Sequence, residues 1–210
     1  MRITHYGHSC LLVQTGSARL LIDPGVFSSG FEAVRELTGV LITHQHPDHL
    51  DPRRLPDLLA ANPGAELIAD GASATQLAEQ GIAARAVQPG ERLELGGSTV
   101  ETVGGEHATV HRDVPVIPNV GYLVDGALLH PGDSLHVPDH PVEILGVPTG
   151  APWLKAGEAV DFMRAVSPRV AVPIHEAILA RPEIVYGLFE HLAPEATTLR
   201  VLEHGQPTML

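Results

Sequence analysis

The sequence predicts an α/β fold (α+β in some classifications) in which two sheets pack face to face and helices cover both outer faces. Strand-like apolar runs open the chain, alternating strands and helices follow, and the same order then recurs. Apolar residues make up 44% of the 210 residues but aromatic residues only 4%, so Val, Leu, Ile and Ala must form the core. Two sheets enclosed by helices would bury these runs. No segment rich in Ser, Pro or Gly divides the chain, so we expect one domain over residues 1–210.

Residues 1–23 are typical of a β-meander, because strand-like runs at 10–13 and 19–22 flank turn residues at 14–17. The elements expected next are a loop or short helix at 26–38, a strand at 39–43, a helix at 53–61, a strand at 66–69 and a helix at 72–80. Gly81 suits the left-handed residue that ends a helix.

The second half repeats the pattern of strands followed by helices. Asp125-Gly126 is a strong hairpin signal between two apolar runs. The expected elements are strands at 84–87, 92–95 and 99–103, a hairpin of 120–124 and 127–130, a strand at 142–147, a helix at 158–166, a strand at 170–174, a helix at 182–192 and a strand at 198–202.

The charge and the cysteine content limit the partners and the compartment. The formal net charge is −12, from 13 basic and 25 acidic residues, which argues against a nucleic-acid backbone or an anionic membrane as partner. No signal-peptide pattern opens the chain, and no apolar run approaches the ~20 residues of a membrane span. A single cysteine, Cys10, excludes an internal disulfide and suits the cytosol. We therefore expect a cytoplasmic protein that binds neither nucleic acid nor a membrane; homo-oligomers stay possible.

The densest cluster of candidate metal ligands is His44-Gln45-His46-Pro47-Asp48-His49, directly after the apolar run 39–42. That run reads as a buried strand, so the cluster lies in the loop at its carboxyl end, where open α/β sheets place their sites. A histidine-rich loop is also compatible with a solvated turn, since Pro47-Asp48 is ordinary turn chemistry. Four ligands within six residues exceed the needs of one catalytic zinc, which favours two metals side by side.

This H-x-H-x-D-H pattern after a strand resembles the signature of the metallo-β-lactamase superfamily. The opening Tyr6-Gly7-His8-Ser9-Cys10-Leu11-Leu12-Val13, followed by Leu21-Ile22-Asp23-Pro24, resembles its ascorbate-6-phosphate-lactonase-like branch. The resemblance extends over nearly the whole chain. It implies a four-layer αββα sandwich of two similar halves, with a metal site along one sheet edge.

The resemblance also implies where the remaining ligands lie. His107, after a strand and two glycines, matches a metal-binding histidine, although His111 is a rival four residues on. Asp133, in Gly132-Asp133-Ser134, matches an aspartate that bridges two metals, although a turn aspartate would look the same. His175, after the strand 170–174, matches the last ligand.

The implied set is two divalent cations, with Asp133 shared. Zinc is expected, although nitrogen and oxygen ligands fit manganese or iron as well. Flavodiiron relatives carry glutamate at the position of His46, so this histidine favours hydrolysis over dioxygen chemistry. The first cation would be bound by His44, His46 and His107, and the second by Asp48, His49 and His175.

The expected activity is therefore that of a dinuclear metal-dependent hydrolase. A metal-bridging hydroxide would attack a small ester-like substrate, which the resemblance implies is a lactone or a phosphorylated or cyclic ester. Asp48 is the candidate for moving a proton, and Asp133 is the second catalytic carboxylate. Alternatives are a non-catalytic metal- or ligand-binding module of the same fold and a nuclease of the same superfamily. The sequence leaves open whether His8, Asp23 and Trp153 line the site, and a lone tryptophan more often packs in the core.

Overall fold

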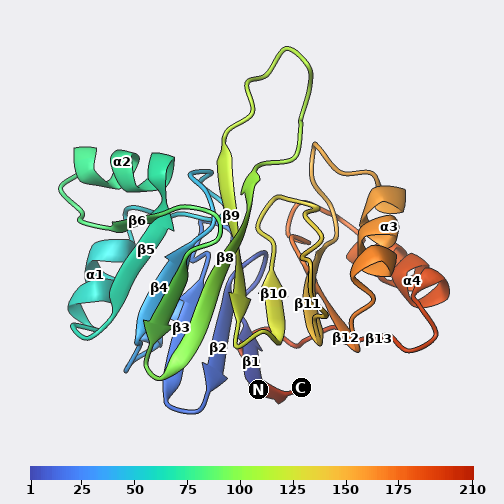
Figure 1. The fold of residues 1–210 in the computed structure, drawn as a ribbon, viewed down its shortest axis with the longest axis horizontal. Helices are drawn as coiled ribbons and strands as arrows, with labels where there is room; N and C mark the ends of the chain where they lie inside the picture. Colours follow the sequence, from blue (N-terminus) through green and yellow to red (C-terminus); the bar gives the residue numbers. More distant parts are fainter.

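The computed structural model describes residues 1–210, and its two seven-stranded sheets pack face to face with helices against both outer faces (Figure 1). This arrangement confirms the predicted four-layer sandwich. None of the helices has the length and apolar character that crossing a bilayer requires.

The first sheet holds the amino-terminal half and the last strand of the chain. The first three strands pair antiparallel, as the meander predicted, and the next three add in parallel. Three helical segments pack against its outer face in one buried cluster: η1 (Phe31–Ala33), α1 (Leu55–Ala60) and α2 (Gly71–Glu79). In spatial order its strands are β14 (Thr208–Met209), β1 (Arg2–His5), β2 (Leu11–Thr15), β3 (Ala18–Ile22), β4 (Gly39–Ile42), β5 (Glu66–Asp70) and β6 (Arg85–Val87).

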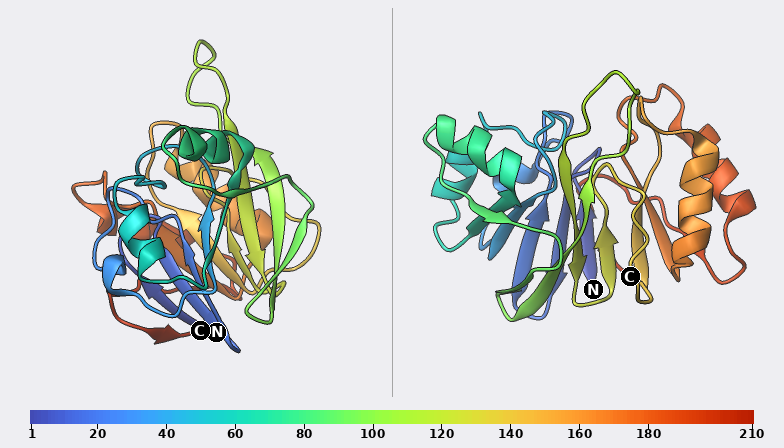
Figure 2. Two further views of the ribbon diagram at one scale, coloured as in Figure 1. Left: turned by 90° about the vertical axis from the view of Figure 1, so that its left-hand side faces the viewer. Right: turned by 45° about the horizontal axis from the view of Figure 1, so that its top comes forward.

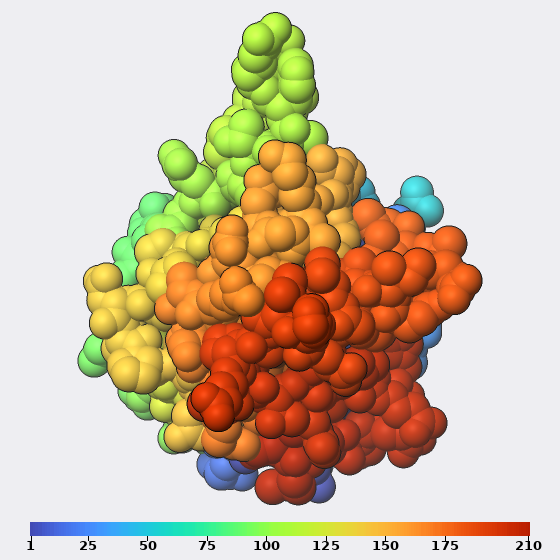
Figure 3. Space-filling view, turned by 90° about the vertical axis from the view of Figure 1, so that its right-hand side faces the viewer, coloured from blue at the N-terminus to red at the C-terminus, as the bar shows by residue number.

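The second sheet has the same mixed character. Its strands from β7 to β10 pair antiparallel, and those from β10 to β13 pair in parallel. Helices α3 (Ala156–Val166) and α4 (Pro182–Leu192) cover its outer face, seen in orange and red in Figure 3. In spatial order its strands are β13 (Thr198–Leu199), β12 (Val170–Ile174), β11 (Ile144–Pro148), β10 (Leu128–His130), β9 (Pro118–Val124), β8 (Ser98–Glu106) and β7 (Arg92–Leu95).

The core between the sheets is aliphatic, as the composition predicted. Its largest cluster contains 21 buried residues, of which Tyr122 is the only aromatic one. The hydroxyl of Tyr122 donates to the carbonyl oxygen of Ile42 at 2.8 Å, so this buried polar group is satisfied and ties β9 to the end of β4. Since β4 leads into the histidine-rich loop, this hydrogen bond fixes the position at which the loop begins.

The largest departure from the expected elements is the length of the β8–β9 hairpin. The expected strand ended at residue 103 because Gly104-Gly105 looked like a turn, but both glycines stay in β8 and pair with Val120 and Asn119. The turn is instead the loop of residues 107–117, which projects beyond the body of the molecule (Figures 1 and 2). His107 therefore lies at the base of this loop.

The carboxyl-terminal segment also differs from the prediction. The strand expected at 198–202 ends at Leu199, and the chain returns to the first sheet as β14, which the sequence did not predict. β14 pairs with β1, and the two termini lie side by side (Figure 2).

Candidate metal centre

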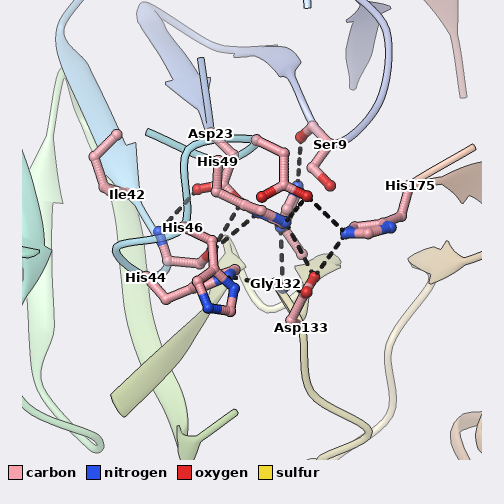
Figure 4. Close-up of polar contacts among 12 residues, drawn as sticks. Ser9, Asp23, Ile42, His44, His46, His49, Gly132, Asp133 and His175 are labelled. Carbon is pink, nitrogen blue, oxygen red and sulfur yellow. Dashed lines mark hydrogen bonds and ion pairs between the residues drawn. The ribbon is translucent and has the colours of Figure 1, made fainter. Parts of the chain in front are cut away.

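All seven predicted ligands come together at the edge where β4, β8, β10 and β12 end. Figure 4 shows five of them, His44, His46, His49, Asp133 and His175. Their donor atoms form two groups, and within each group all the donor atoms lie within 4.8 Å of one another. The first consists of His44, His46, His107 and Asp133, and the second of His8, Asp48, His49 and His175. The grouping matches the expected division between two cations, with His8 as an additional member.

Asp133 lies between the two groups and faces both. Its Oδ2 is 3.3 Å from Nε2 of His107 and 3.9 Å from Nε2 of His44. Its Oδ1 is 3.0 Å from Nε2 of His49 and 3.2 Å from Nε2 of His175. One carboxylate thus presents one oxygen to each group, which is the geometry that a shared ligand requires.

The backbone before Asp133 is fixed by a close approach. Gly132 has φ +61°, and a Cβ there would lie 2.3 Å from Oδ1 of Asn119. The same Asn119 oxygen accepts the Asp133 N–H at 3.0 Å. Only glycine permits this turn, because a side chain would displace the asparagine that holds the aspartate.

Several inward-facing donor atoms of the cluster lack hydrogen-bond partners within the protein. Four of them are buried and unpaired: Nε2 of His49, His107 and His175, and Oδ1 of Asp133. Leaving buried polar atoms unpaired costs ~1–3 kcal/mol each. A divalent cation in each group would satisfy these atoms, and nitrogen and oxygen donors without cysteine suit zinc, manganese or iron. The residues therefore fit a metal centre.

In three of the histidines the Nδ1 atom contacts an oxygen of the protein, and this contact orients the ring so that Nε2 points into the cluster. Nδ1 of His107 donates to the carbonyl of Ala108, and Nδ1 of His175 to that of Gly150, both at 2.6 Å. Nδ1 of His49 lies 2.7 Å from Oδ2 of Asp23. Such contacts fix the tautomer that leaves Nε2 available for a metal.

Asp23 is a buried carboxylate that supports the ligand loop. Its Oδ1 accepts the N–H of Thr43 and its Oδ2 accepts the Thr43 hydroxyl, both at 2.8 Å. The sequence left open whether Asp23 assists a ligand or only ends its turn. The contact with His49 places it behind the second group of ligands.

Burial and neighbouring charges shift the pKa values of several residues in the cluster. Burial lowers the pKa of His44 well below its usual value. For His175 burial acts in the same direction, but the adjacent carboxylates of Asp133 and Asp48, 3.2 and 3.5 Å from its Nε2, outweigh it and raise the pKa to about 9. Burial opposes the charged form of Asp133, yet His49, His107 and His175 hold its pKa well below the usual range. The positive charge favoured on His175 thus balances the carboxylates beside it.

His8 contacts the second group directly. Its Nε2 is 3.0 Å from Oδ2 of Asp48, and its Nδ1 accepts the N–H of Ala177 at 3.3 Å, so Nε2 carries the proton. Glu176, to which the sequence gave no role, accepts the backbone N–H of His8 at 2.9 Å. His8, Asp23 and His175 all have positive φ, from +51° to +61°. This strained conformation is rare outside glycine and gathers at sites that other contacts hold in place.

Trp153 contacts the other side of the centre. The sequence favoured core packing, and the side chain is indeed buried. Its indole N–H also donates to Oδ2 of Asp133 at 2.8 Å. Sequence reasoning missed this contact, although the only tryptophan in a loop after a strand end was the available signal.

The structure separates the two rival histidines after β8. His107 is buried within the first group. His111 lies in the projecting loop with an exposed side chain, and its Nδ1 is 3.6 Å from Oδ2 of Asp113. His111 is therefore outside both groups.

Comparisons with known proteins agree with this geometry. A family described as a beta-lactamase superfamily domain matches residues 2–175. Protein Rv0786c of Mycobacterium tuberculosis is 54% identical over 203 residues, covering 94% of this chain and 93% of that protein. A UPF0173 metal-dependent hydrolase of Pyrobaculum arsenaticum is 29% identical over 83% of this chain and 84% of its own.

Among solved structures, Igni18, a metallo hydrolase of Ignicoccus hospitalis, has the same fold. It superposes with a TM-score of 0.77 over 99% of this chain and 97% of its own, at 21% identity. The sandwich, the sheet-edge cluster and these matches show that the chain belongs to the metallo-β-lactamase superfamily and is a metal-dependent hydrolase.

Proposed function

We propose that this hydrolase is dinuclear and cleaves small ester-like substrates with a hydroxide that two cations generate. The observation that carries the proposal is the pair of donor groups joined by Asp133, whose inward-facing atoms include four that are buried without partners. In this assignment His44, His46 and His107 hold one cation and Asp48, His49 and His175 the other. Asp133 would be shared between them, since each of its oxygens faces one group.

The chemistry divides between the metals and the chain. Two cations would lower the pKa of a shared water so that hydroxide is available near neutral pH. Asp133 sets the distance between the two groups because each of its oxygens faces one of them. The Asp48 side chain is 20% exposed, against 4% for Asp133, so Asp48 is the carboxylate open to a substrate. We assign Asp48 the transfer of a proton, with the His8 N–H holding its Oδ2.

The substrate class follows from charge and from the resemblance of the opening motif. Two divalent cations bring a charge of +4 and the carboxylates of Asp48 and Asp133 bring −2, which leaves about +2 at the centre. Such a centre attracts a carbonyl or an anionic group despite the acidic surface. Together with the likeness of the Gly7-His8-Ser9 segment to the ascorbate-6-phosphate-lactonase-like branch, this favours lactones and phosphorylated or cyclic esters.

Metal content tests the proposal most directly. We expect about two equivalents of zinc, manganese or iron in the purified protein by plasma mass spectrometry, and fewer in His46→Ala. His111→Ala is the matched control, because His111 lies outside both groups. The metal found then sets the conditions for a screen of lactones and phosphoesters. A protein that holds no metal and cannot be reconstituted would overturn the proposal.

A further inference from the structure

We propose that Trp153 is a positioning residue that holds the Asp133 carboxylate toward the first group of ligands and sets the metal affinity there. The inference rests on the dinuclear function proposed above and assigns one more residue to it. It starts from an asymmetry in the contacts of Asp133: only one of the two carboxylate oxygens receives a hydrogen bond from a side chain outside the two groups.

That oxygen is the one that faces His44 and His107. Oδ2 accepts the Trp153 indole N–H at 2.8 Å, whereas Oδ1 makes no hydrogen bond and faces His49 and His175. A carboxylate oxygen has two lone pairs, so Oδ2 can accept the indole N–H and still bind a cation. The indole therefore fixes the plane of the carboxylate without occupying the metal position.

The indole of Trp153 is enclosed by the protein. The side chain is 9% exposed, and its ring meets those of His107 and His175 edge to face, with centroids 5.9 Å and 6.4 Å away. The backbone on either side is closed by a bridge between Ala151 and Leu154. An indole is only a donor, so a buried one needs an acceptor, and Asp133 is the acceptor here.

Removing this donor frees the carboxylate to rotate away from the first group. Partners behind metal ligands typically contribute about 10–100-fold to metal affinity, and we expect a loss of that size. The loss of affinity should affect only the cation bound by the first group. The Oδ1 side is set by His49 and His175, whose rings are held independently by Asp23 and Gly150.

The test uses two replacements of the indole. Trp153→Phe removes the N–H and part of the ring. β-(3-Benzothienyl)alanine keeps the bicyclic shape but carries sulfur in place of the N–H. Because the chain contains one tryptophan, replacing tryptophan throughout the protein changes this position alone. Zinc binding is measured by competition with a chromophoric chelator. We expect both replacements to weaken one equivalent about 10–100-fold and leave the other nearly unchanged.

A double-mutant comparison assigns the weakened equivalent. In an Asp48→Ala background, which disables the second group, Trp153→Phe should still weaken zinc binding. In a His46→Ala background, which disables the first group, it should add nothing. The reverse pattern would overturn the assignment of Trp153 to the first group. Wild-type affinity with the benzothienyl replacement would show that ring shape matters and the hydrogen bond does not.

Fluorescence gives a readout that is independent of activity. Trp153 is the only tryptophan and contacts Asp133, so its emission should change when zinc is added to the metal-free protein. Zinc is closed-shell and has no redox chemistry, so the change reports the surroundings of the indole. Two bound zinc ions in wild type with unchanged affinity in both replacements would overturn this inference alone. A wild-type protein that binds no zinc would overturn the dinuclear function as well.

Discussion

At the scale of single residues, the metal ligands depend on the residues that hydrogen-bond to them from behind, and Asp23 is one of these. Asp23 accepts from His49 and twice from Thr43 while its own backbone is left-handed, with φ +51°. Asn adopts this conformation as readily as Asp, so Asp23→Asn removes the charge and leaves the turn. We expect about 10–100-fold weaker binding of the cation held by His49, measured by chelator competition.

The matched control for that change is Asp125→Asn. Asp125 also has positive φ, at +52°, and its carboxylate accepts from Thr15 and Thr99, but it lies in the exposed β9–β10 turn. The Asp125→Asn substitution should leave the metal affinity unchanged. Equal effects of the two variants would mean that Asp23 matters only as a turn residue.

His175 gives a pH-dependent prediction. Its pKa, raised to about 9 in the absence of metal, means that the ring is protonated at pH 7. Only the neutral ring binds a cation, so binding must displace this proton. The apparent affinity should therefore rise with pH up to about 9 and level off above it. A pH-indicator dye would record the proton released on adding zinc in weak buffer, and affinity independent of pH between 6 and 9 would contradict the prediction.

The residues of the cluster differ in how far the sequence reveals them. His44, His46, Asp48 and His49 lie within six consecutive residues, so their spacing alone suggests a metal loop. The contact of Trp153 with Asp133 joins two loops 20 residues apart and depends on the backbone after β11. No local pattern encodes that path, which is why the sequence could propose the loop and not the contact.

At the scale of elements, the loop after β4 is held against the segment after β3. A Cβ at Gly25 would lie 1.8 Å from the carbonyl oxygen of Asp48, far closer than non-bonded atoms can approach. Gly25→Ala should therefore push the ligand loop outward and reduce bound metal below two equivalents. Plasma mass spectrometry measures this loss directly.

Gly64 provides the comparison for Gly25. A Cβ at Gly64 meets nothing within 4 Å, so Gly64→Ala should keep its metal. Circular dichroism on both variants separates a displaced loop from an unfolded protein. Full metal content in Gly25→Ala would show that the loop adapts without losing its ligands.

The elements themselves were predictable where the pattern is local. The apolar runs of β4, β5 and β12 and the Asp125-Gly126 turn identify strands and a hairpin without tertiary information. The extension of β8 through Gly104 and Gly105 depends on pairing with β9, and β14 depends on pairing with the amino terminus. Register and edge pairing arise between distant segments, so single-sequence patterns do not contain them.

At the scale of the whole molecule, each group of ligands draws on both sheets. His44 and His46 follow β4 of the first sheet, whereas His107 and Asp133 follow β8 and β10 of the second. The second group has the same division, with His49 in the first half and His175 in the second. A cation in either group would thus connect the two halves at the open edge of the sandwich.

Metal should consequently stabilise the entire fold and not only the loops. A ligand that binds the native state at 100 times its dissociation constant adds about 2.7 kcal/mol to the free energy of unfolding. We expect chelation to lower the melting temperature in thermal unfolding, and added zinc to restore it. His107→Ala should lose part of this metal-dependent shift, because it removes a second-sheet ligand of the first group and leaves the second group intact. His111→Ala should keep the shift, since its side chain is exposed outside both groups. If the protein holds two metals but chelation leaves its melting temperature unchanged, the aliphatic core alone connects the two halves.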